Sequence, residues 1–189
     1  FTYTPPADVN FFGTDTFTYT IEQDAANTPS STGDTSSTGT VTINIQPVND
    51  GPINTVPTPG PLFVDEDQTL SFTGISVQDI DADDRDEAGD GLGSGLTLTL
   101  SVSNGTLNVS GASMSNGGRT ATLNGQVSQI NNALGGLTYS PDTNFFGNDV
   151  LTVNTNDNGN TGESALSDND TVNITINPIN DPPTLVVQG

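Results

Sequence analysis

Apolar and polar residues alternate along several stretches of the chain, and this alternation predicts β-strands. The clearest stretch is residues 96–102, where leucine or valine occupies every second position and threonine or serine the others. Residues 41–45 and 172–176 repeat the pattern with valine and isoleucine. Successive side chains of a strand point to opposite faces, so each segment should bury one face and expose the other. Weaker signals predict further strands over residues 17–21, 69–73, 106–109, 120–123, 150–155 and 184–187.

One segment has a different period. Residues 126–134 space their apolar side chains three and four positions apart, at Val127, Ile130 and Leu134, which predicts a short helix. Clusters of Gly, Pro, Asn and Asp between the alternating segments are typical of turns. Many short strands with one short helix indicate an all-β fold built as a β-sandwich.

The sequence also contains an internal repeat about one domain long. Four motifs recur in the same order, in the pairs 1–5 and 137–141, 10–15 and 144–149, 40–45 and 171–176, and 47–52 and 178–183. We therefore expect three parts: residues 1–50 as the C-terminal part of one repeat, residues 51–183 as a complete repeat, and residues 184–189 as the start of another. The first repeat would lack roughly 80 residues, which is more than one donated strand supplies. We therefore favour an array cut at this point over completion by another chain.

Each repeat carries the motif Asn-Phe-Phe-Gly-x-Asp just before a predicted strand. Gly13 and Gly147 are expected to supply an unusual φ at this point. The paired phenylalanines could form a ligand platform, but the sequence returns at once to strand alternation. We therefore expect them to anchor the core.

The composition excludes many kinds of chemistry. The chain has 23 Asp and Glu against two basic residues, Arg85 and Arg119, and a formal net charge of −21. It contains no His and no Cys, so Ser-His-Asp triads, cysteine nucleophiles, thiolate zinc sites and disulfides are excluded. The absence of Lys excludes Schiff-base and P-loop lysines.

The charge also restricts the partners. A strongly negative chain repels nucleic acids and anionic membranes, and no apolar run is long enough to predict a membrane-spanning helix. Carboxylate chemistry remains, either as binding of hard cations such as Ca²⁺ or as the paired carboxylates of a glycosidase. We expect no enzyme, because no aromatic-lined pocket accompanies the acids.

The acids gather in one part of the chain. Ten of the 23 fall between Asp65 and Asp90, and Asp79, Asp81 and Asp83 alternate along one side of an extended segment. Carboxylates this close repel one another unless a cation neutralises them, and Ca²⁺ takes six to eight oxygen ligands. A solvated acidic loop is the alternative. The pairs 49–50 and 180–181, both Asn-Asp, each leave a predicted strand and enter a proline-restricted linker.

Three segments carry a resemblance to a known family: residues 137–149, 171–183 and 64–68. Together they resemble the cadherin-like tandem repeats of large bacterial surface and secreted proteins. The resemblance implies Greek-key cadherin- or immunoglobulin-like β-sandwich repeats in tandem, with Ca²⁺ where consecutive repeats meet. A complete cadherin linker is missing, so one or two ions per junction are expected. The acidic and Asn-Asp positions that match the family's junctions give the expected metal ligands: Asn49, Asp50, Asp65, Glu66, Asp67, Asp79, Asp81, Asp83, Asp157 (or Asp24), Asn180 and Asp181.

The resulting hypothesis is a calcium-stiffened structural repeat of an extracellular bacterial adhesin stalk or surface fibre, which mediates adhesion or assembly. Its partners would be neighbouring repeats of the same chain or fibre, with a cell-surface glycan or other copies of the chain as further candidates. Two alternatives stay open. One is a carbohydrate-binding module that uses Tyr3, Tyr19 or Tyr139. The other is a subunit of a polymeric filament, joined by a terminal strand such as 184–187.

Overall fold

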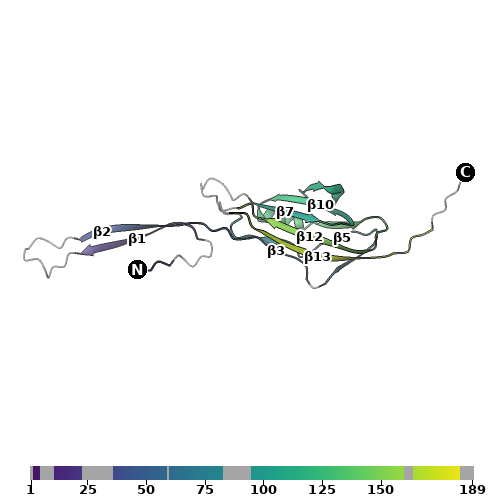
Figure 1. Cartoon of the computed structure of the whole chain (residues 1–189), viewed down its shortest axis with the longest axis horizontal. Coiled ribbons are helices and arrows are strands. Elements are labelled where there is room, and N and C mark those ends of the chain that lie inside the picture. Colours follow the sequence, from purple (N-terminus) through teal and green to yellow (C-terminus); the bar gives the residue numbers. More distant parts are fainter. Residues whose placement is uncertain are drawn as a thin grey trace, which may run out of the picture. The chain divides into compact units, whose positions relative to one another are not determined.

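The structure is a computed structural model that describes residues 2–4, 11–22, 36–58, 60–82, 95–159 and 164–183. The chain divides into two compact units, Phe1–Val48 and Asn49–Gly189, which we call unit 1 and unit 2. Strands dominate both units, and the described part of the chain contains one α-helix (Figure 1). The all-β class with one short helix is thus confirmed. Within the described ranges we find no helix with the length and hydrophobicity of a membrane span.

Unit 1 consists of a single antiparallel strand pair in its described part. β1 (Gly13–Glu22) pairs with β2 (Ser36–Ile45) over ten residue pairs, from Gly13 opposite Ile45 to Glu22 opposite Ser36. Both strands contain the segments whose alternation predicted them. No third strand joins this sheet among the described residues.

Unit 2 has a main sheet of six strands. Their spatial order is β4 (Leu62–Asp65), β13 (Ser167–Asn177), β12 (Gly147–Asn156), β7 (Leu96–Ser101), β10 (Thr120–Gly125) and β9 (Ser113–Ser115). All neighbours are antiparallel except β4 and β13, which run parallel from Leu62 opposite Ile174 to Asp65 opposite Asn177. The C-terminal end of the last strand is therefore bonded to a strand from the beginning of the unit.

Two smaller sheets and the helix complete unit 2. They comprise β5 (Leu70–Ser71), β11 (Thr138–Pro141) and β8 (Gly105–Asn108) in one sheet, β3 (Ile53–Thr55) and β6 (Ser76–Gln78) in the other, the helix α1 (Val127–Leu134) and a short 3-10 turn (Asn116–Gly118). One hydrophobic cluster joins the main sheet, the smaller sheets and α1. The main sheet, the smaller sheets and α1 therefore share a single core.

The core confirms the two periodicities read from the sequence. Leu96, Leu98 and Leu100 of β7 are completely buried, and α1 buries Ile130 and Leu134. Each apolar face is thus the one that the alternation or the helical spacing predicted.

The predictions made for the Phe-Phe-Gly motif are confirmed in part. Gly13 and Gly147 have φ values of 111° and 129°, a conformation that favours glycine, as expected. Phe145 packs against the core, but the side chain of Phe146 is 61% exposed. The prediction that both phenylalanines anchor the core is therefore wrong for the second, because consecutive side chains point to opposite sides of an extended chain.

The alternation missed several short strands. β3, β4, β6, β9 and β11 have three or four residues each, which is too few to show a period. The strand expected over residues 69–73 shrinks to β5, and that expected over 184–187 lies outside the described residues.

Candidate metal centre

One cluster of polar side chains lies where unit 2 begins. The Nδ2 of Asn49, the first residue of the unit, donates hydrogen bonds to Oδ2 of Asp157 (2.7 Å) and to the carbonyl oxygen of Ser164 (3.3 Å). The backbone N–H of Asp50 donates to Oδ2 of Asp81 (3.0 Å). The linker end of unit 2 is therefore held by side chains that come from two distant parts of the sequence.

Asp157 accepts hydrogen bonds from several groups of this cluster. It follows β12 directly and is completely buried. Its Oδ1 accepts hydrogen bonds from the backbone N–H groups of Gly159 (2.9 Å) and Leu166 (2.8 Å). Asp157 therefore joins both ends of the β12–β13 connection and holds Asn49 against them.

Asp79 and Asp81 lie in a tight turn after β6. Oδ1 of Asp79 accepts hydrogen bonds from the backbone N–H groups of Asp81 and Ala82, both at 3.1 Å. The strand before the turn is fixed by α1, since the Asn131 side chain bonds both the N–H and the carbonyl of Val77, at 2.8 and 2.9 Å. Through Asn131, the helix thus positions the turn that carries the carboxylates of Asp79 and Asp81.

Three oxygen atoms of the cluster are buried without a hydrogen-bond partner in the part of the chain that the structure describes. They are Oδ1 of Asn49, Oδ2 of Asp79 and Oδ1 of Asp81. A buried polar atom without a partner costs about 1–3 kcal/mol, and more when it is charged. Three such oxygens in one cluster would suit a ligand that accepts lone pairs, which is either a cation or a proton.

Burial raises the pKa of Asp79 from 3.8 to about 7, and the neighbouring Asp81 contributes to the increase. The cause is elementary electrostatics, because a carboxylate removed from water and placed beside a second carboxylate is hard to ionise. Without a compensating cation, one proton is therefore held at this pair up to neutral pH.

Other expected ligands lie at the far end of unit 2. Oδ1 of Asp65 accepts a hydrogen bond from Nδ2 of Asn177 (3.1 Å), and Oε1 of the buried Glu66 accepts one from the N–H of Ile179 (2.5 Å). These contacts are made beside the C-terminal end of β13, whereas Asp157 lies near its N-terminal end. Eleven residues of strand separate the two ends by roughly 30 Å.

The remaining expected ligands also fall outside the cluster or contribute to it only through the backbone. Asp67 has a φ of 59°, and its Oδ1 accepts a bond from the N–H of Asn144 (3.2 Å). Nδ2 of Asn180 donates to the carbonyl oxygen of Asp181 (3.2 Å). Asp50 contributes its backbone N–H to the cluster. Asp83 and the alternative Asp24 lie outside the described residues.

Sequence reasoning missed a second polar network, which is centred on Asp149. This buried carboxylate accepts hydrogen bonds from the Tyr139 hydroxyl (2.9 Å) and from the N–H groups of Ser103 (3.1 Å), Asn104 (2.7 Å) and Val150 (2.8 Å). One signal could have found it, since the repeated motifs contain both Tyr139 and Asp149. Because Tyr139 is completely buried, it is not available as a sugar-stacking ring.

A comparison with protein families gives a match to part of unit 2. A family model described as the Protein GAMETE EXPRESSED 2 (GEX2) domain matches residues 94–176, somewhat less than half of the chain. A comparison with curated proteins finds no match. The matched stretch runs from the start of β7 nearly to the end of β13.

This match corrects the family predicted from the motifs. The chain resembles the GEX2 domain, so its assignment to the cadherin-like repeats of bacterial surface proteins is wrong. The short motifs that suggested it consist of strand alternation and Asx-Pro turns, which unrelated β-domains share.

The description as a bacterial calcium-binding cadherin repeat is wrong for the same reason, and a second finding bears on it. Among the residues that the structure describes, no group of three or more His, Cys, Asp or Glu side chains could hold a metal ion. Within the described ranges, the expected junction of many carboxylates is therefore not formed. The cluster at the start of unit 2 is smaller, and among the described residues its oxygens without a hydrogen-bond partner come from two carboxylates and one amide.

Proposed function

We propose that unit 2 is a non-enzymatic structural module of an extracellular protein, and that a divalent cation such as Ca²⁺ fixes its linker end. The observation that carries the proposal is a set of three buried oxygens, on Asn49, Asp79 and Asp81, to which no group in the described part of the chain donates a hydrogen bond. Carboxylate and amide oxygens are the ligands that Ca²⁺ prefers, with backbone carbonyls and water completing its shell. Asn49 and Asp81 are more than nine-tenths buried, so water compensates these oxygens poorly.

A cation at this place would have a mechanical role. Asn49 is the first residue of unit 2 and adjoins the linker, whereas Asp79 and Asp81 belong to the turn held by α1. The ion would therefore tie the linker to the body of unit 2 and restrict its angle. It would also remove the repulsion between the two carboxylates.

The same proposal includes the way in which successive domains follow one another along the protein. We propose that the chain is part of a tandem array of Greek-key, immunoglobulin-like β-sandwiches whose partners are the neighbouring repeats. The recurrence of four motifs in the two units supports this organisation. The acidic surface and the lack of cysteine suit a chain that relies on bound cations rather than disulfides in calcium-rich surroundings outside the cell.

Calcium should stabilise unit 2. Extracellular modules bind Ca²⁺ with Kd on the order of 10⁻⁴–10⁻³ M, so about 10 mM Ca²⁺ should add about 2 kcal/mol to the free energy of unfolding. That corresponds to a rise of about 5 °C in Tm for a unit of this size. Thermal unfolding followed by circular dichroism, in EDTA and across a Ca²⁺ titration, measures the rise.

Two variants make this test specific. Asp81→Asn removes one ligand charge and should abolish most of the calcium-dependent rise in Tm. Asp67→Asn makes the same charge change at the far end of unit 2, where asparagine tolerates the φ of 59°, and should keep the rise. The proposed cation site would be refuted by equal Tm values with and without Ca²⁺ together with no binding heat for Ca²⁺, Mg²⁺ or Mn²⁺.

The raised pKa of Asp79 predicts a pH dependence in EDTA. The folded protein holds this proton up to a pKa of about 7, whereas the unfolded chain releases it near 3.8, so stability should fall as the pH rises between these values. Because Asp79 is only half-buried, we expect a loss of about 2 kcal/mol, well below the unscreened value. Urea unfolding at pH 4 to pH 7 measures it.

The matched comparison for this pH dependence is Asp79→Asn, which cannot titrate. The difference in stability between the parent and Asp79→Asn should vary with pH in EDTA and much less in saturating Ca²⁺, because the cation takes the place of the proton. A pH profile that is the same for parent and variant in EDTA would show that Asp79 does not titrate in this range.

A further inference from the structure

The strand pair of unit 1 repeats a strand pair of unit 2 residue by residue. Gly13 lies opposite Ile45 as Gly147 lies opposite Ile176, and the two registers stay in step over all ten pairs of β1–β2 and β12–β13. The equivalence therefore extends from the sequence motifs to the hydrogen-bonded ladder.

A side-chain contact is repeated as well. The Tyr3 hydroxyl donates to Oδ2 of Asp15 at 2.7 Å, and in unit 2 the Tyr139 hydroxyl donates to Oδ2 of Asp149 at 2.9 Å. In unit 2 this tyrosine belongs to β11, a strand of the smaller sheet. Unit 1 thus already holds the tyrosine that, in unit 2, comes from the three-stranded sheet.

The two strand pairs differ in their neighbouring strands and in how deeply their apolar side chains are buried. In unit 2, β4 pairs with β13 and β7 pairs with β12, and Leu151 and Val153 have no exposed surface. Their counterparts in unit 1, Phe17 and Tyr19, are 43% and 46% exposed. Large aromatic side chains exposed together in this way mark a surface that normally meets a partner.

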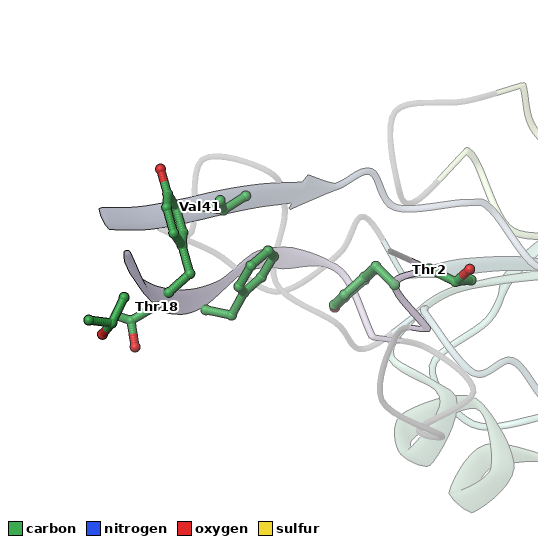
Figure 2. A pocket seen from close by; sticks show the side chains of 7 residues that line it. Thr2, Thr18 and Val41 are labelled. Carbon is green, nitrogen blue, oxygen red and sulfur yellow. The ribbon is translucent and has the colours of Figure 1, made fainter. Parts of the chain in front are cut away.

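The exposed face is also hollowed. Tyr3, Phe17, Tyr19 and Val41 line a cavity of about 910 Å³ together with neighbouring threonines (Figure 2). The ring of Tyr19 lies over Gly39, where a Cβ atom would come within 2.6 Å of it. The absence of a side chain at Gly39 therefore lets the Tyr19 ring lie directly on β2.

We propose that this face of unit 1 binds a polypeptide segment built like residues 51–136, supplied by the same polypeptide ahead of Thr2. A strand like β4 would add parallel to β2, and a strand like β7 would add antiparallel to β1, as in unit 2. A second copy of the chain is a poorer occupant. Its own β4 and β7 are already bonded to β13, β12 and β10, so it would have to open its own core.

The residues of the face specify the partner further. Phe17 and Tyr19 are larger than their counterparts Leu151 and Val153. A core of constant thickness needs smaller side chains opposite larger ones. The occupant should therefore carry an alternating apolar strand like residues 96–100 beside β1, and smaller apolar side chains in the segments that pack across the core from the two rings.

The test joins residues 51–136 of this chain to Phe1 of the full chain, so that Phe1 takes the place of Leu137. Hydrogen exchange then compares the β1 and β2 amides with and without the added segment. We expect exchange to slow at least tenfold when the segment is present. Phe17→Asp should abolish this protection, whereas Thr16→Asp, which makes the same charge change at an adjacent position of β1 that does not line the cavity, should keep it.

A second fusion controls for the possibility that Phe17 and Tyr19 are too large for the added segment. It carries Phe17→Leu and Tyr19→Val, which give β1 the residues of β12 that the added segment already fits. Unprotected β1 and β2 amides in both fusions would overturn the proposal. It would also be overturned if the original chain formed dimers that Phe17→Asp dissociates, because the occupant would then be a second copy.

Discussion

Replacing Asp149 by alanine should lower the free energy of unfolding of unit 2 by about 4 kcal/mol. The carboxylate is buried and accepts four hydrogen bonds, from one tyrosine hydroxyl and three backbone N–H groups. Alanine would leave these donors buried without an acceptor, and each unsatisfied group costs more than the bond itself contributes. The loss should appear in urea unfolding followed by circular dichroism, as a lower midpoint with the slope unchanged.

Two variants show that burial is the cause. Asp149→Asn keeps an oxygen acceptor and should lose less than Asp149→Ala. Asp15→Ala removes the equivalent carboxylate of the repeated motif in unit 1, where its bond to Tyr3 is exposed, and should leave the midpoint of unit 2 unchanged. A loss below about 1 kcal/mol for Asp149→Ala would mean that water replaces the carboxylate at these donors.

Gly105→Ala should lower the free energy of unfolding by about 3 kcal/mol. Gly105 lies in β8 opposite Pro141, and a Cβ atom there would overlap the ring of Tyr139 and lie 2.5 Å from the carbonyl oxygen of Ser140. The carbonyl belongs to the neighbouring strand and cannot rotate away, so β8 and β11 would have to separate. Urea unfolding again measures the loss.

Gly136→Ala provides the matched comparison for Gly105→Ala. It makes the same substitution at an exposed position, where the nearest atom, the carbonyl oxygen of Ala133, is 3.7 Å from the new Cβ. Its effect on stability should stay within about 1 kcal/mol, since alanine also reduces the entropy of the unfolded chain. Equal effects of the two variants would contradict the close approach of Tyr139 to Gly105.

The secondary structure was predictable where a segment was long enough to show a strand or helix periodicity. Residues 96–102 alternate over seven positions and residues 126–134 repeat a helical spacing, and both produced the expected element. Ile53–Thr55 and Ser76–Gln78 are three-residue strands, fixed by their pairing with each other and by the side chains of Asp168 and Asn131. Contacts of this kind join distant parts of the sequence, so no local pattern indicates them.

The candidate site was predictable by residue type and not by location. Alternating carboxylates at Asp79 and Asp81 and an Asn-Asp pair at the linker were sufficient to suggest a cation. The sequence did not show that Glu66 belongs to the other end of unit 2. That depends on the parallel pairing of β4 with β13, which places residues 62–65 beside the last residues of the unit.

The parallel pairing of β4 with β13 also determines how unit 2 would carry a load. A pull between Asn49 and Asn180 reaches β4 through its first residue and β13 through its last, so the two strands are drawn past each other along their length. The hydrogen bonds across the four residue pairs of β4 and β13 are then loaded in shear and must break together. A hairpin opened from one end would instead lose its bonds one after another at a lower force.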